Sequence, residues 1–335
     1  MNLSKRIISI DVLKSISIFG VVFIHARNGN IITEYISELF RVAVPVFVIF
    51  FAYFLDKSLS KSTSKNEYFS IFKNRFKVLF MPYLLFTVLY FFMLNDLATI
   101  HLHDLITGYW SGYGWPGQYF FIILFQLIFL FPLIQKMATW HKNVILLFFV
   151  LSIFTYFLLS YFLWGISVFS LISDRLFIYW IPFALFGIIL HRNKAITNVA
   201  SKINIVLFSL ILIPFEFILL NQLQLTHSPY IIPSVLVASL LMANYFVDQQ
   251  ESIERVMASQ LKNVSIYISQ RSLGIFVLNP FVIYLLKKIP VVNIHVNNLF
   301  LEAFINITFA IVSFGGALLM VALLENTFLK RVVVN

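Results

Sequence analysis

The first apolar stretch of the chain, near residues 7–26, contains three ionisable side chains: Asp11, Lys14 and His25. Such residues are costly inside a membrane span, so each one marks a candidate functional site. Lys14 and His25 are eleven residues apart, which at 100° per residue places them on one helix face. Along the axis they would be about 16 Å apart. Asp11 lies one turn before Lys14, so we expect an ion pair between them.

A cation and an imidazole on one stripe of a helix are typical of the wall of a channel through a protein. Each residue also has a simpler interpretation. His25 could be an interfacial histidine at a helix end, and Asp11 with Lys14 could be a buried pair that only fixes helix packing. The common face favours the channel, which requires a fold that surrounds this helix with others.

The composition indicates such a fold. Of the 335 residues, 60% are hydrophobic, only 11% are charged, and Phe occurs 39 times. The mean hydropathy of +0.91 excludes a soluble domain, which would be about a quarter charged. Most apolar runs approach the twenty residues that a membrane-spanning helix needs. We therefore predict an all-α polytopic membrane protein of about ten transmembrane helices, forming one domain over residues 1–335. The helices lie near residues 7–26, 39–55, 78–95, 119–135, 144–163, 176–190, 203–220, 230–247, 273–286 and 299–324.

Basic residues predict the orientation of these helices. They cluster at the N-terminus, in the loops that follow the second and sixth stretches, and in the C-terminal tail, whereas no Lys or Arg lies between Asn95 and Gln118. The positive-inside rule then places both termini in the cytoplasm. Lys287 and Lys288 are exceptions on the outer side. The formal net charge of +10 reflects these loops, so we expect no nucleic acid partner.

The loop at residues 95–118 is rich in aromatic residues and glycine. It is typical either of an interfacial belt or of a sugar-binding lip, where flat rings stack on pyranose faces. His101 and His103 in this loop are a weak zinc signal, and we expect no metal. The chain has no cysteine, so disulfides and thiolate sites are absent.

The opening of the chain, with Asp11, Lys14 and then His25 after ten further residues, resembles that of the acyltransferase-3 family of integral membrane O-acyltransferases. Further similarities follow in the family's order along nearly the whole chain, at residues 44–48, 72–77, 82–83, 115–121 and 272–280. The chain departs from the family pattern at several positions. Lys14 stands where Arg is usual, Phe51-Ala52 where Ser-Gly is common, Phe276 for Tyr and Asn279 for His.

The resemblance implies an enzyme that moves an acetyl group from cytoplasmic acetyl-CoA to a hydroxyl of a cell-surface or lipid-linked glycan. His25 would act as general base or would transiently accept the acyl group, with Asp11 as the second catalytic residue. The distance of about 16 Å from Lys14 to His25 is comparable to an extended pantetheine arm. The residues expected to bind substrates are Lys14, Lys73, Arg75 and Lys77 for the donor, and Trp115, Gln118, Tyr119 and Asn279 for the acceptor.

The expected setting is the inner (cytoplasmic) membrane, with the lipid bilayer and a glycan acceptor as partners; a homo-oligomer is compatible with the sequence. Two other functions stay open. One is an exporter of a polysaccharide or lipid-linked sugar, although no pair of repeated halves with Gly/Pro-broken helices is evident. The other is a membrane-bound partner subunit without chemistry. Independently of these alternatives, the chain has two further intramembrane carboxylates, Glu216 and Glu325, and either could orient His25 or pair with a basic residue.

Overall fold

The computed structural model describes residues 6–95, 101, 108–109, 112, 114–140, 142–163, 175–193, 202–225, 228, 230–289, 298–327 and 329–334. These residues form helices and connecting turns, and no strand occurs among them. The elements are α1 (Ile8–Ala26), α2 (Ile31–Leu39), the 3-10 turn η1 (Phe40–Val42), α3 (Ala43–Leu59), α4 (Lys65–Leu94), α6 (Gln118–Trp140), α7 (Lys142–Leu158), the π-helical turn η3 (Leu159–Leu163), α9 (Phe177–Asn193), α10 (Ile203–Gln222), α11 (Pro233–Asp248), α12 (Gln250–Val256), α13 (Ser259–Gln270), α14 (Ser272–Lys287), α15 (Leu299–Leu324) and α16 (Lys330–Val333).

Every predicted apolar stretch falls on one of these helices, and the chain is an all-α polytopic membrane protein. Within the described residues, seven spans are long and apolar enough to cross a membrane, with α2, η1 and α3 counted as one span. The pair α13 and α14, bent by 72°, would be an eighth. The remaining two stretches, α9 and α11, are shorter helices. Both are largely enclosed by other helices, so their length need not match the bilayer.

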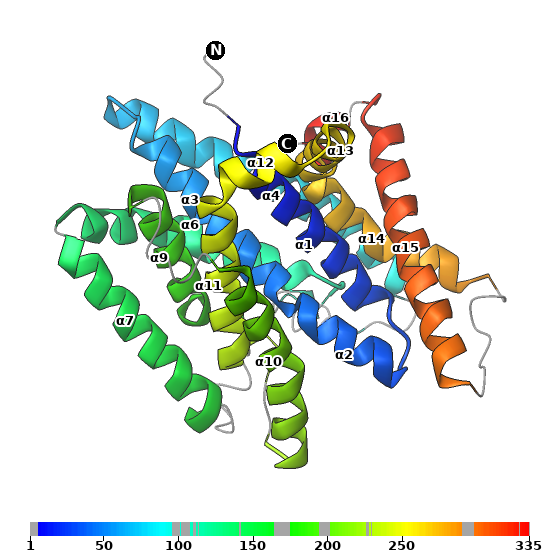
Figure 1. Cartoon of the computed structure of the whole chain (residues 1–335). Coiled ribbons are helices and arrows are strands. Elements are labelled where there is room, and N and C mark those ends of the chain that lie inside the picture. The colour runs from blue at the N-terminus through cyan, green and yellow to red at the C-terminus, as the bar shows by residue number, and fades with distance from the viewer. Residues whose placement is uncertain are drawn as a thin grey trace.

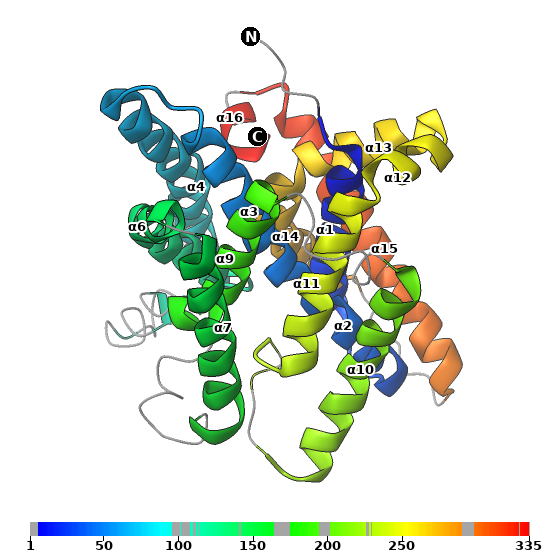
Figure 2. The same ribbon diagram turned by 60° about the vertical axis from the view of Figure 1, so that its left-hand side comes forward.

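Helix α1 lies inside the bundle and packs against α3, α13, α14 and α15 (Figures 1 and 2). In its apolar window 67% of the residues are buried, against 22% in α4, α7 and α10. In a protein of this composition the exposed apolar faces of those three helices are the lipid-facing surface. The helix that carries Asp11, Lys14 and His25 is therefore shielded from lipid on most sides.

The far end of α1 is fixed by a tight turn into α2. Gly29 has a φ of 54°, the left-handed region that glycine adopts without strain. The next residue, Asn30, caps α2 by accepting hydrogen bonds from the amides of Ile32 and Thr33. Its side-chain amide donates to Glu302 in the first turn of α15. The end of α1 near His25 is therefore tied to both α2 and α15.

The bend between α13 and α14 is held by a partly buried ion pair. Arg271 at the break donates to both carboxylate oxygens of Glu325 at 2.5–3.0 Å, and its guanidinium lies 3.5 Å from the centre of the Tyr267 ring. Bidentate pairing of this kind fixes orientation as well as charge. As a result α14 begins abruptly beside α1, with its N-terminus directed into the bundle.

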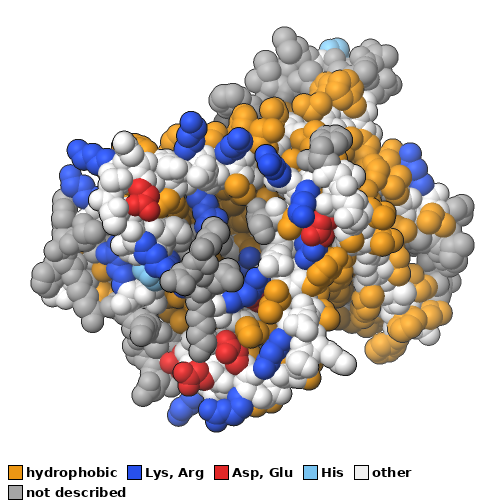
Figure 3. Space-filling view, turned by 90° about the horizontal axis from the view of Figure 1, so that it is seen from above, with side chains coloured by type: hydrophobic (Ala, Val, Ile, Leu, Met, Phe, Trp, Pro, Cys, Tyr) orange, Lys and Arg blue, Asp and Glu red, His pale blue; other side chains and the backbone are white. Residues whose placement is uncertain are grey.

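The beginning of α1 and the C-terminal helix α16 lie on one face of the bundle, the upper face in Figure 1. Figure 3 looks onto this face and shows Lys and Arg side chains gathered around a central hollow. Its identification with the cytoplasmic side stays a prediction from the positions of the basic residues.

Candidate active site

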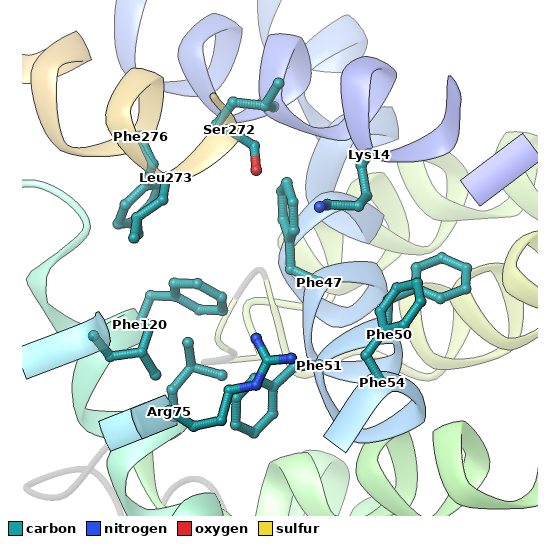
Figure 4. A pocket seen from close by; sticks show the side chains of 13 residues that line it. Lys14, Phe47, Phe50, Phe51, Phe54, Arg75, Phe120, Ser272, Leu273 and Phe276 are labelled. Carbon is teal, nitrogen blue, oxygen red and sulfur yellow. The ribbon is translucent and has the colours of Figure 1, made fainter. Parts of the chain in front are cut away.

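A pocket lies between α1, α3, α4, α6 and α14 (Figure 4). Most of its wall is apolar, and α3 alone contributes four phenylalanines at helical spacing. The lining residues are Lys14, Ile18, Phe47, Phe50, Phe51, Phe54, Arg75, Leu79, Phe120, Leu124, Ser272, Leu273 and Phe276. The only charged groups in this lining are both cationic.

The two cations reach the pocket from different helices. Lys14 projects from α1 and Arg75 from α4, and both side chains point into the space between them (Figure 4). Among the described residues, Lys14 makes one hydrogen bond, to the carbonyl of Ser269 at 3.4 Å, and Arg75 makes none. Neither forms an ion pair with a described residue. Two like charges that share an apolar-walled pocket repel each other, and an anion between them would relieve that repulsion.

Asp11 forms no ion pair with Lys14 and acts on it only electrostatically at longer range, so the expected ion pair is wrong. The Asp11 carboxylate is engaged by Arg6, whose guanidinium donates to its two oxygens at 2.5 and 3.0 Å, and by the Ser269 hydroxyl at 2.6 Å. Arg6 precedes α1 and folds back over its first turn. Asp11 therefore ties the start of α1 to the end of α13, and leaves the ammonium group of Lys14 available to the pocket.

The first turn of α14 adds a third positive element. Ser272 and Leu273 line the pocket, and the Ser272 hydroxyl points into it (Figure 4). Free amides and the helix dipole make a helix N-terminus favourable for a negative group. The bend at Arg271 is what brings this N-terminus beside Lys14.

The other two basic residues predicted to bind the donor do not reach this space. Lys73 and Lys77 are exposed on α4, as Arg75 is, but unlike Arg75 they are absent from the pocket lining. A step of two residues turns a helix by 200°, so either lysine faces away from Arg75. Leu79, four residues after Arg75, lines the pocket beside it.

His25 lies at the opposite end of α1 from Lys14, about 16 Å away along the unbroken helix axis. Its side chain is half-buried and makes no hydrogen bond to a described residue. It does not line the pocket, whose α1 wall ends at Ile18. In this conformation the pocket therefore stops short of the imidazole.

A buried charged cluster beside His25 was not predicted from the sequence. Arg41 in η1 donates to the Glu38 carboxylate at 3.0 Å, and both residues are almost inaccessible. The guanidinium of Arg41 lies 4.7 Å from the Tyr230 ring centre. Arg27 lies 3.6 Å from the same carboxylate, and both arginines act electrostatically on His25. Arg41 falls inside the second apolar stretch. The rule that ionisable residues inside a membrane span mark candidate sites, which singled out Lys14, would therefore also have found Arg41.

The predicted acceptor residues are mostly engaged within the fold. The Trp115 indole donates to the Thr87 hydroxyl at 3.1 Å. The buried Gln118 amide accepts from the amide of Gly114 at 2.8 Å and donates to the Tyr83 hydroxyl. Tyr119 is half-buried, with its ring centre 5.7 Å from that of Tyr230. Of the four, Tyr119 is thus the one beside the Arg41 cluster.

Asn279, the fourth predicted acceptor residue, is fully buried in α14. Its amide nitrogen donates to the carbonyl of Phe276 at 2.5 Å. Its side-chain oxygen has no hydrogen-bond partner among the described residues.

The two other intramembrane carboxylates bind partners away from His25. Glu325 pairs with Arg271, as described above. Glu216 accepts hydrogen bonds from the Tyr161 hydroxyl and from the amide of Ser234 at 2.8 Å, and so caps α11. Of the two histidines that gave the weak zinc signal, His103 lies outside the described residues, and no cluster of three or more His, Asp or Glu side chains that could hold a metal occurs within them.

The fold and the pocket define an integral membrane protein that can receive an anionic group between two cations, with a histidine deeper in the same central helix. A family model described as an acyltransferase domain matches residues 7–325, nearly the whole chain. The chain therefore belongs to the acyltransferase-3 family, and this membership supports membrane acyltransferase activity. No curated protein and no solved structure was found to match the chain.

Proposed function

We propose that this protein transfers an acetyl group from cytoplasmic acetyl-CoA to a hydroxyl of a cell-surface or lipid-linked glycan. The observation that carries the proposal is the pair Lys14 and Arg75, which face one pocket without an acidic partner among the described residues. The phosphates of CoA are the anions that an acyltransferase must bind, and charge-assisted hydrogen bonds to phosphate are strong.

The rest of the pocket suits the arm of such a donor. Its phenyl-lined wall can cover the methyl and methylene groups of pantetheine, while the phosphates stay between the two cations and the α14 N-terminus. The arm would extend from Lys14 along α1 towards His25, a distance of about 16 Å. The bulky nucleotide then remains on the face shown in Figure 3 while the acyl group moves inwards.

We assign the chemical step to His25. As general base, the imidazole would take the proton from the acceptor hydroxyl while the hydroxyl oxygen attacks the thioester carbon. The carbon–sulfur bond breaks, an ester forms, and the proton passes to the CoA sulfur. The alternative route is two-step, with the acyl group held transiently on the imidazole before the hydroxyl takes it. Asp11, bonded to Arg6 and Ser269, positions the donor end of α1 in this proposal.

The proposal is tested by incubating purified protein in lipid nanodiscs with acetyl-CoA and candidate glycans. We expect release of free CoA that depends on the glycan, together with an acetyl ester on the glycan detected by mass spectrometry. In proteoliposomes, glycan flux without CoA release would instead show an exporter. If the protein neither binds acetyl-CoA nor transports the glycan, the remaining function is that of a partner subunit without chemistry.

A further inference from the structure

A buried carboxylate that the proposed reaction does not use lies just beyond the pocket. Asp56 on α3 is fully buried, two residues after Phe54 of the pocket wall. Two basic residues of α9 compensate its charge. Arg192 donates to its two oxygens at 2.8 and 3.0 Å, and the Nδ1 atom of His191 lies 2.7 Å from one of them. These bonds tie α3 to α9, and a buried charge paired in this way holds its partners in one geometry.

The same network reaches α4 through one side chain. The Gln135 amide on α6 donates to Asp56 in a long hydrogen bond of 3.5 Å, and its oxygen accepts from the Tyr68 hydroxyl on α4 at 2.7 Å. The Tyr68 ring centre is 5.0 Å from that of Phe72, which lies 6.4 Å from that of Phe131 on α6. Hydrogen bonds and ring contacts therefore join the start of α4 to α3, α6 and α9.

Tyr68 and Arg75 lie on one face of α4. They are seven residues apart, which is 20° short of two full turns and about 10 Å along the axis. Arg75 makes no hydrogen bond to a described residue, so its position in the pocket depends on where α4 lies. Only 22% of the apolar window of α4 is buried, and the next hydroxyls of α4 that bond to another part of the chain, on Tyr83 and Thr87, come after Arg75. Among the described residues, Tyr68 makes the one side-chain hydrogen bond that ties the part of α4 before Arg75 to another helix.

We propose that Tyr68 is a positioning residue for donor binding, because its bond to Gln135 fixes the start of α4 and so holds Arg75 at the pocket. This inference rests on the proposed function and adds a positioning residue to it. Without the bond, the start of α4 can move away from α6 and Arg75 moves with it. Donor binding must then restore the position of Arg75, and the measured affinity falls by the cost of that rearrangement.

The test is a double-mutant cycle on acetyl-CoA binding, measured by calorimetric titration in nanodiscs. We expect Tyr68→Phe to weaken binding about fivefold, the effect of one lost hydrogen bond. In the Arg75→Ala background the same substitution should change the dissociation constant less than about 1.5-fold, because the group that Tyr68 positions is absent. A merely structural role would weaken binding equally in both backgrounds. The matched control is Tyr161→Phe, which removes a hydroxyl bonded to Glu216, away from α4, and should leave the affinity unchanged.

A second measurement does not depend on the donor. The chain has no native cysteine, so spin labels can be placed at Lys73→Cys on α4 and at Leu261→Cys, an exposed site on α13. We expect Tyr68→Phe to broaden the distribution of distances between the two labels, because the start of α4 is released. Tyr161→Phe should leave that distribution as in wild type.

The outcomes separate this inference from the proposed function. If wild type binds acetyl-CoA but Tyr68→Phe leaves the affinity unchanged, or weakens it equally with and without Arg75, the inference is overturned while the donor stands. An unchanged distance distribution in Tyr68→Phe also overturns it, since α4 is then held by other contacts. If wild type binds no acetyl-CoA, the proposed donor is wrong and this inference falls with it.

Discussion

Lys14 on α1 and Arg75 on α4 project into the same phenyl-lined pocket, although they are 61 residues apart in the sequence (75 − 14 = 61). Neither forms an ion pair with a described acidic residue, because Asp11, one turn before Lys14 on α1, is bonded to Arg6 and Ser269. This arrangement leaves a net positive site that an anionic ligand can stabilise. The following predictions test its consequences.

Replacement of Arg75 by alanine should weaken acetyl-CoA binding by about tenfold or more, the loss expected for charge-assisted hydrogen bonds to phosphate. The matched control is Lys73→Ala, on the same helix and of the same charge but outside the pocket lining. It should change the dissociation constant less than twofold. Calorimetric titration of both variants checks this prediction. If the two substitutions change the dissociation constant equally, the basic residues act only in membrane orientation.

Lys14→Arg should be tolerated, with donor affinity within about threefold of wild type. It keeps the positive charge and supplies more donors for phosphate oxygens. It also restores the residue usual in the family. Lys14→Gln, which is close in length but neutral, should lose about tenfold in donor affinity. Identical affinities for the two variants would mean that the Lys14 charge takes no part in donor binding.

The buried Glu38–Arg41 pair should be essential for stability. Glu38→Ala leaves the Arg41 guanidinium buried without its carboxylate, and breaking such a pair typically costs about 3–5 kcal/mol. Glu34→Ala, one turn earlier on α2, removes a half-exposed carboxylate 3.8 Å from Arg27 and should cost less than about 1 kcal/mol. Thermal unfolding in detergent measures the stability of both variants. A Glu38→Ala protein as stable as Glu34→Ala would contradict the essential role of the Glu38–Arg41 pair.

The face that carries α16 and the start of α1 should be cytoplasmic. Single cysteines can report this directly, since the chain has none of its own. Lys61→Cys, between α3 and α4, should react with a membrane-impermeant maleimide only after the cells are opened. Gln222→Cys, at the far end of α10, should react in intact cells. The reverse pattern would invert the topology and place the Lys14–Arg75 pocket on the wrong side for acetyl-CoA.

Sequence patterns predicted the all-α membrane fold and the shared face of Lys14 and His25, because apolar length and helical periodicity depend only on local sequence. They did not predict the partner of Asp11. The spacing rule considers residues on one helix, whereas Arg6 reaches back from before the helix and Ser269 comes from α13. For Lys73, Arg75 and Lys77 the helical turn of 100° per residue already shows that the three cannot share one face.

Other parts of the site depend on tertiary structure. The ring contacts of Phe120 with Phe47 and with Phe276 in the pocket wall join three helices that are distant in sequence. The position of the α14 N-terminus depends on the Arg271–Glu325 pair, whereas the sequence left the partner of Glu325 open. Gly117 is one of several glycines in the loop at residues 95–118, and its contact with the Phe276 ring appears only in the packed structure.

The central claim is that acetyl-CoA binds at Lys14 and Arg75 and that its acyl group is transferred at His25. It is tested most directly by measuring acetyl-CoA binding and acetyl transfer on the same preparation of His25→Ala, normalised to folded protein. The account predicts a donor affinity within about threefold of wild type, because His25 lies outside the donor pocket. It also predicts a loss of transfer of about a hundredfold or more, as for the removal of a general base. Near-normal transfer by His25→Ala would contradict the account.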